Sequence, residues 1–236
     1  MNADRIISSV LIIMAFAFCV QCKKASLSAP VPHSADTVTK TMLSLGDSYT
    51  FGQSVKASER FPQQTADILK QEGINIDPIT FVAKTGWTTI DLLSAMQRLP
   101  GNKTYDYVTL LIGVNDEYQS LNIADYPGRF ASLLKKAIAC AGGRTDHVIV
   151  ISIPDYSITP FVTGQDKTAV SAAIADYNTI NKKIAKGSSC AYIDINEVYR
   201  EGAADESLIA GDHLHPSGKE YRKWANLLAG YIATLK

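Results

Sequence analysis

Residues 43–50 read Leu-Ser-Leu-Gly-Asp-Ser-Tyr-Thr, an apolar run that ends in Gly-Asp-Ser. This pattern is typical of a buried strand that stops at a tight turn and leaves a hydroxyl at its carboxyl end. In open α/β sheets, ligands bind at that edge. Ser48 is therefore either an ordinary turn or capping residue, because serine is common in both roles, or a nucleophile.

The composition excludes several classes of protein. The chain has 236 residues and is 46% hydrophobic, which is enough for one sizeable core and one folded domain. Its 23 basic and 23 acidic residues give a formal net charge of zero, so no nucleic-acid-binding footprint is expected. The absence of a repeat of 20 to 50 residues in the sequence argues against solenoids and propellers.

The first 22 residues resemble an export signal. The segment 6–20 is apolar apart from two serines, too short to span a bilayer comfortably but suited to a signal-peptide core. Cys22 follows it and resembles the lipidation box of bacterial lipoproteins, although Gln21 stands where a small residue is usual. We expect an exported, cell-envelope protein. Cys22 then anchors it to the membrane, or ordinary cleavage within residues 21–29 releases it to the periplasm.

Residues 23–40 are small, polar and interrupted by proline, so we expect a flexible tether before a folded domain at 41–236. Beyond the leader, only Cys140 and Cys190 remain. An exported domain can pair two such cysteines. The sequence leaves the pairing open, because it does not show whether their Cα atoms approach.

From residue 41 onward, apolar runs alternate with amphipathic stretches. Such strands, buried on both faces and each followed by a helix, predict a parallel sheet with helices on both sides. We expect a three-layer α/β/α domain with about five strands in the flavodoxin-like order 2-1-3-4-5, since the chain is too short for an eight-stranded barrel. The predicted strands are 42–45, 74–82, 107–112, 147–153 and 191–195. The predicted helices are 61–71, 88–99, 126–141, 168–186 and 216–235, the last with Pro216 in or near its first turn.

Polar residues follow the predicted strands at what should be one edge of the sheet. Gly46-Asp47-Ser48 follows the first strand, and Gly113-Val114-Asn115-Asp116 follows the third. Asp212-His213-Leu214-His215-Pro216 precedes the last helix, and Gly86 lies in the loop after the second strand.

These residues resemble the four sequence blocks of the SGNH (GDSL-type) ester hydrolases, in the family's order. Gly46-Asp47-Ser48-Tyr49 is similar to the nucleophile block, with Tyr49 where leucine is frequent. Gly86 matches the glycine block, Gly113-x-Asn115-Asp116 the asparagine block, and Asp212-x-x-His215 the acid and base block. The resemblance covers about residues 42–231 and implies the flavodoxin-like SGNH hydrolase fold.

The resemblance also implies the chemistry. Ser48 would be the nucleophile, His215 the base that takes its proton, and Asp212 the acid that orients the imidazole. The oxyanion donors would be the backbone amides of Ser48 and Gly86 and the side-chain amide of Asn115. The implied activity is hydrolysis of acyl or acetyl esters through an acyl-enzyme, without a cofactor or a metal.

Several of these residues also allow other roles. His213 competes with His215 for the role of base, and His215 is preferred because Pro216 follows it as in the family pattern. Two histidines in one loop also suggest a metal site. Zinc, however, needs three or four ligands, and the nearby sequence contains no His or Cys cluster. Asp47 is expected to cap the turn or the following helix, and Asp116 to support the Asn115 loop.

Two alternative functions remain open at this point: a noncatalytic carbohydrate-binding module on the same fold, and an O-acyltransferase that uses the same nucleophile. We expect a small-molecule or polysaccharide ester as substrate, no nucleic-acid partner, and a monomer. Several residues are candidates for the border of the cleft: Gln53, Glu59, Trp87, Tyr118, Arg129 and the loop 158–161.

Overall fold

The computed structural model of the protein describes residues 39–235. The predicted signal peptide, Cys22 and nearly all of the predicted tether lie outside the described residues. The first element, strand β1 (Thr39–Gly46), begins at the end of the predicted tether.

Five parallel strands form one sheet in the order β2-β1-β3-β4-β5, which confirms the predicted fold class and strand order. The strands are β1, β2 (Asn75–Ala83), β3 (Tyr107–Leu111), β4 (Val148–Ile151) and β5 (Ala191–Ile193). Gly46 at the end of β1 lies level with Ala83 of β2 and with Leu111 of β3. The loops that follow these three strands therefore begin at the same edge of the sheet.

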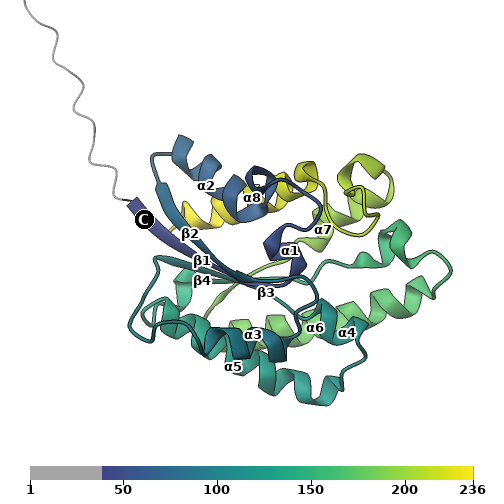
Figure 1. Cartoon of the computed structure of the whole chain (residues 1–236), viewed down its shortest axis with the longest axis horizontal. Helices are drawn as coiled ribbons and strands as arrows, with labels where there is room; N and C mark the ends of the chain where they lie inside the picture. Colours follow the sequence, from purple (N-terminus) through teal and green to yellow (C-terminus); the bar gives the residue numbers. More distant parts are fainter. Residues whose placement is uncertain (1–38, 236) are drawn as a thin grey trace, which may run out of the picture. The chain divides into compact units, whose positions relative to one another are not determined.

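Helices cover both faces of the sheet (Figure 1). On one face lie α2 (Phe61–Gln71) and α8 (Gly218–Ile232), and on the other α3 (Thr89–Met96), α5 (Tyr126–Cys140) and α6 (Lys167–Gly187). The central strands β3 and β4 and the last five residues of β1 are fully buried between the two layers, which explains their continuous apolar runs. The edge strands β2 and β5 are more exposed. Within residues 39–235, no helix combines the length and the hydrophobicity that a membrane span requires.

Several short elements were not predicted. These are α1 (Ser48–Phe51), α4 (Val114–Tyr118) and α7 (Asn196–Tyr199), each too short to show a helical period in sequence. The 3₁₀ turns are Ala57–Glu59, Ile123–Asp125, Thr145–His147, Tyr156–Ile158, Pro160–Val162, Arg200–Ala203 and Glu206–Leu208.

The predicted start of the last helix is wrong by two residues. Helix α8 begins at Gly218 after the N-cap Ser217, so Pro216 precedes the helix. Pro216 instead forms an antiparallel bridge with Ile209, and the Ala210 N–H donates to the His215 carbonyl at 2.7 Å. This pairing keeps the backbone at Pro216 out of the helix.

The possible disulfide is not formed in the structure. Cys140 ends α5 and Cys190 directly precedes β5, and both are free thiols. Burial raises the pKa of both thiols, for Cys190 to about 11, so they stay protonated at neutral pH.

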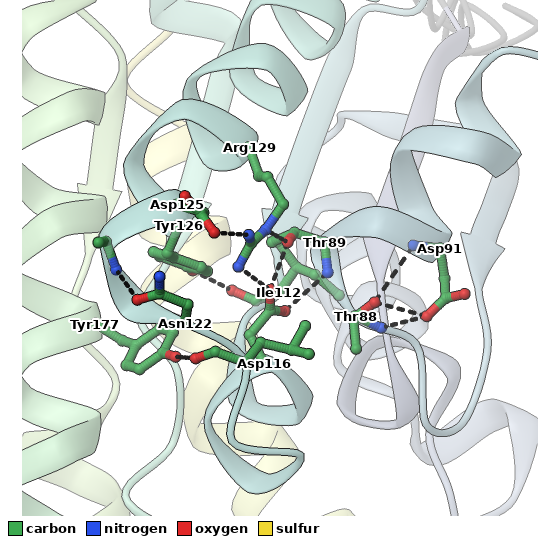
Figure 2. Close-up of polar contacts among 12 residues, drawn as sticks. Thr88, Thr89, Asp91, Ile112, Asp116, Asn122, Asp125, Tyr126, Arg129 and Tyr177 are labelled. Atoms are coloured by element: carbon green, nitrogen blue, oxygen red, sulfur yellow. Dashed lines mark hydrogen bonds and ion pairs between the residues drawn. The ribbon is translucent and has the colours of Figure 1, made fainter.

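A buried carboxylate, that of Asp116, joins α4 to the start of α3 and to α5 (Figure 2). Asp116, in α4, has no exposed surface. It accepts hydrogen bonds from the Thr89 backbone N–H at 2.8 Å and from the Thr89 hydroxyl at 2.5 Å. Arg129 of α5 lies 3.3 Å from the same carboxylate, and its Nε donates to the Thr89 hydroxyl at 2.9 Å. Asp116 therefore supports the Asn115 loop as predicted, by tying α4 to α3 and α5.

The start of α3 is fixed independently of Asp116. Thr88 is the N-cap, and its side chain and that of Asp91 form a capping box. Gly86 lies two residues before this cap, and its carbonyl accepts a hydrogen bond at 3.1 Å from the side chain of Gln119, the residue that follows α4. The backbone at Gly86 is thus connected both to α3 and to the end of α4.

Replacing Arg129 with methionine should lower the free energy of unfolding by about 2 to 4 kcal/mol, because the buried Asp116 carboxylate loses its cation. Arg129→Lys should fall between wild type and Arg129→Met, since lysine keeps the charge without the planar fork. Urea unfolding measures both effects.

The matched control for Arg129 is Lys40→Met. This change removes the half-exposed pair with Asp106 and should cost only about 0 to 1 kcal/mol. Equal losses in the two methionine variants would contradict the anchoring role of Arg129.

Candidate active site

The turn that presents Ser48 is built from the residues on either side of it. A Cβ on Gly46 would collide with the Thr50 side chain and the Leu111 carbonyl, so only glycine fits this close approach. Asp47 is the N-cap of α1 and accepts a hydrogen bond from the Tyr49 N–H at 3.0 Å, as predicted. Ser48 is thereby the first residue of a helix that begins at the end of β1.

Ser48, His215 and Asp212 lie in a continuous hydrogen-bonded row. Ser48 Oγ is 2.8 Å from His215 Nε2, and His215 Nδ1 is 2.7 Å from Asp212 Oδ2. Because an ionised carboxylate only accepts hydrogen bonds, Nδ1 carries the proton and Nε2 is free to accept from the Ser48 hydroxyl. The structure thus brings together the three residues that the sequence analysis selected as nucleophile, base and acid.

The environment of Asp212 favours its charged form. Partial burial acts to raise the pKa of this carboxyl group, but hydrogen bonds from Ser54, His215 and Leu214 outweigh it and lower the pKa to about 2. The Leu214 and His215 backbone N–H groups donate to Oδ1 at 3.0 and 2.9 Å. Asp212 therefore remains a carboxylate throughout the neutral and mildly acidic range.

The candidate oxyanion donors border the same pocket as Ser48. Gly86 has φ +82°, a left-handed conformation that favours glycine. The Asn115 side-chain amide donates one hydrogen to the Trp87 carbonyl at 3.0 Å, which leaves its second hydrogen available. Ser48, Gly86, Asn115 and His215 all line one pocket of about 150 Å³.

Aromatic side chains form much of the remaining wall of this pocket. Tyr118, Tyr156 and Phe161 line it, and the Tyr118 and Phe161 rings lie 5.9 Å apart. The Tyr156 hydroxyl donates to Glu117 at 2.7 Å, which holds that ring in place. The predictions for Tyr118 and for the end of the loop 158–161 are therefore confirmed.

Other predicted border residues do not line this pocket. Trp87 packs against the core and contributes its carbonyl to Asn115. Arg129 bonds to Asp116 and Thr89, Gln53 to Thr85, and the Glu59 carboxylate to the Lys56 N–H.

His213 is placed apart from the pocket that Ser48 borders. It has φ +62° and lines a separate pocket with Pro160, Glu206 and Ala210. Its carbonyl accepts a hydrogen bond from the Phe161 N–H at 3.1 Å. Among residues 39–235, no group of three or more His, Cys, Asp or Glu side chains is arranged to hold a metal ion.

Ser54 was not predicted from the sequence to contact the site. Its hydroxyl donates to Asp212 Oδ2 at 2.5 Å, across 158 positions of the chain. A serine two residues after a glycine gives no signal of such a contact, because serine is common in turns.

Asp47, next to the candidate nucleophile, has the opposite environment to Asp212. It is fully buried, and within the described part of the chain no group hydrogen-bonds its Oδ2. Burial, with a smaller contribution from the nearby Asp116 charge, raises the pKa of Asp47 from 3.8 to about 7, although the Tyr49 N–H lowers it.

This shift predicts a pH-dependent stability. Between pH 3.8 and about 7 the folded protein keeps a proton that the unfolded chain releases, so the free energy of unfolding falls as pH rises through that window. Asp47→Asn keeps an acceptor for the Tyr49 N–H and cannot ionise. Its stability relative to wild type should therefore rise by on the order of 4 kcal/mol from pH 4 to pH 8. Denaturant unfolding of both proteins measures this difference, and parallel curves would refute it.

Comparison with known proteins agrees with this geometry. Residues 44–223 match the profile of the GDSL-like Lipase/Acylhydrolase family. Among curated proteins, no sequence matches the chain significantly.

Solved structures share the fold at low identity. A family 3 carbohydrate esterase of Clostridium thermocellum gives a TM-score of 0.67 at 20% identity, over 84% of this chain and 96% of that one. The psychrotrophic esterase EstA of a Pseudoalteromonas species gives 0.65 at 16% identity, over 83% and 98%. The acetylxylan esterase Axe2 of Geobacillus stearothermophilus gives 0.64 at 18% identity, over 82% and 94%.

The matched segment spans most of the chain and includes every residue selected as nucleophile, base, acid or oxyanion donor. The chain belongs to the GDSL-like Lipase/Acylhydrolase family of carboxylic ester hydrolases.

Proposed function

We propose that this protein is a serine esterase that cleaves short-chain carboxylic esters through an acyl-enzyme on Ser48. The observation that carries the proposal is the row of hydrogen bonds from Ser48 Oγ through His215 to Asp212, at 2.8 and 2.7 Å. A serine hydroxyl is a weak nucleophile unless a neighbouring base takes its proton, and His215 Nε2 is in position to do so.

The proposed reaction has two stages. Ser48 Oγ attacks the ester carbonyl while His215 takes the hydroxyl proton, and the Asp212 carboxylate stabilises the imidazolium that forms. The negative charge that develops on the carbonyl oxygen is met by the Ser48 and Gly86 backbone amides and the Asn115 side chain. His215 then protonates the departing alcohol. Water, deprotonated by the same imidazole, hydrolyses the acyl-enzyme and restores Ser48.

The pocket supports a short acyl group. Its volume of about 150 Å³ is close to that of a protein cavity that holds one benzene molecule, which corresponds to roughly six carbon atoms. The apolar groups of Val114, Phe161 and Leu214 line it and suit an alkyl chain better than a charged group.

An exported, cell-envelope location is part of the proposal. Its support is the apolar segment 6–20 and Cys22, read from the sequence alone. A small-molecule ester or an acetylated polysaccharide then suits the site, and acyl transfer to a sugar hydroxyl would use the same acyl-enzyme.

Ser48→Ala should abolish hydrolysis of p-nitrophenyl butyrate and labelling by a fluorophosphonate probe, because the attacking oxygen is gone. Asn115→Ala should lower kcat by on the order of 10² to 10³ while keeping the probe reaction detectable, since one oxyanion donor is lost. Steady-state kinetics and gel-based labelling measure these effects. Ser58→Ala, a change at an exposed serine outside the pocket, is the control. Full activity in the Ser48 variant would exclude this mechanism. A wild-type protein that neither hydrolyses the ester nor reacts with the probe would instead indicate a noncatalytic binding module.

Hydrolysis of p-nitrophenyl esters from acetyl to palmitoyl should give the highest kcat/KM at acyl lengths of two to about six carbons, since longer chains exceed the pocket. Phe161→Ala, which removes one wall, should move the optimum to longer chains without a loss on acetate. A palmitoyl ester that reacts faster than the acetyl ester in the wild-type enzyme would overturn the short-chain assignment.

A further inference from the structure

The turn that follows α1 is bonded directly to the backbone of Ser48. The Ser48 carbonyl accepts hydrogen bonds from the Gly52 N–H at 2.8 Å and from the Gln53 N–H at 3.0 Å. Gly52 ends the helix in the left-handed conformation with φ +76°. Residues 52–54 are therefore positioned by the same element that carries the proposed nucleophile.

Ser54 in this turn has an unusual backbone conformation. Its φ is +65°, which non-glycine residues rarely adopt. The side chain that this conformation presents donates a hydrogen bond to Asp212 Oδ2 at 2.5 Å. Ser54 is exposed, so its hydroxyl could be satisfied by solvent and burial does not require the bond. Ser189 has a similar conformation, so it is the bond to Asp212 that distinguishes Ser54.

Ser54 gives Asp212 a connection that its own loop does not supply. The other described donors to this carboxylate are Leu214 N–H, His215 N–H and His215 Nδ1, at 3.0, 2.9 and 2.7 Å. All three belong to the loop of Asp212 and move with it. Ser54 donates from the element of Ser48, and to the same oxygen that faces the imidazole. The Asp212 side chain is 29% exposed, so water competes for that oxygen whenever the bond opens.

The side chain of Gln53 connects the same turn to the loop that carries Gly86. Gln53 Oε1 accepts a hydrogen bond from the Thr85 hydroxyl at 2.7 Å, and Thr85 precedes Gly86. The turn at residues 52–54 thus links helix α1, which carries Ser48, both to Asp212 and to the Gly86 loop.

We propose that Ser54 is a positioning residue for the ester hydrolysis: it holds the Asp212 carboxylate in line with His215 and Ser48. This inference rests on the proposed function, since it concerns how Ser48, His215 and Asp212 are kept aligned. A neutral hydroxyl suits the role because it holds the carboxylate in place without neutralising the charge that His215 needs.

The test uses Ser54→Gly. Glycine removes the hydroxyl and also relieves the left-handed backbone, so the variant should fold with little change in melting temperature. We expect kcat for p-nitrophenyl butyrate to fall about tenfold with KM little changed, because only the alignment of the reacting groups is affected. Ser54→Ala also removes the hydroxyl but keeps the Cβ, which restricts the backbone as in serine. This variant should show a similar loss of kcat.

The matched control is Ser189→Gly. Ser189 is also exposed and left-handed, with φ +56°, and follows α6 outside the pocket. It should keep wild-type kinetics. Wild-type kcat in both Ser54 variants would overturn the inference.

A double-mutant cycle separates positioning through Asp212 from a general structural effect. In an Asp212→Ala background, Ser54→Gly should cause no further loss of kcat, because its target is absent. A full additional tenfold loss in that background would overturn the inference. Failure of the proposed function would appear differently, as activity that survives Ser48→Ala. Loss of activity in Ser48→Ala together with unaffected Ser54 variants would refute only the role of Ser54.

Discussion

The parallel alignment of β1 with its two neighbours is the constraint on which the site depends. Gly46 lies level with Ala83 on one side and with Leu111 on the other, so the loops that carry Ser48, Gly86 and Asn115 start at one edge. This alignment leaves no room for a side chain at Gly46, where a Cβ would meet the Leu111 carbonyl. The packing of the sheet therefore requires glycine at position 46, independently of the reaction at Ser48.

Once the sheet has brought the loops together, aspartate side chains stabilise them. The role of each aspartate depends on how deeply it is buried and on which groups donate hydrogen bonds to it. Asp116 is buried beside Arg129 and ties the Asn115 helix to the start of α3. Asp212 accepts four hydrogen bonds and keeps a low pKa, as an acid that must stay charged beside an imidazole requires. Asp47 accepts one described side-chain hydrogen bond, and burial raises its pKa to about 7. Three acids near one site thus differ because their donors and burial differ.

Local signals in the sequence located the large elements well and the short ones poorly. Helix α2 has the predicted bounds, since its apolar positions follow the helical period and Gly73 lies just beyond its end. Helices α1 and α4, of four and five residues, carry no measurable period, although they present Ser48 and Asn115. Pro216 was expected inside α8, but its pairing with Ile209 competes with the helix and places it before the N-cap.

The sequence by itself determined the alternation of strands and helices and the residue types of the four blocks, because periodicity and side-chain chemistry are local properties. Only the tertiary structure could show that His215 rather than His213 borders the pocket, how large that pocket is, and that Cys140 and Cys190 are free. The same holds for the contacts of Ser54 with Asp212 and of Arg129 with Asp116. These features depend on how elements far apart in the chain pack together, and no local pattern in the sequence records the distance between them.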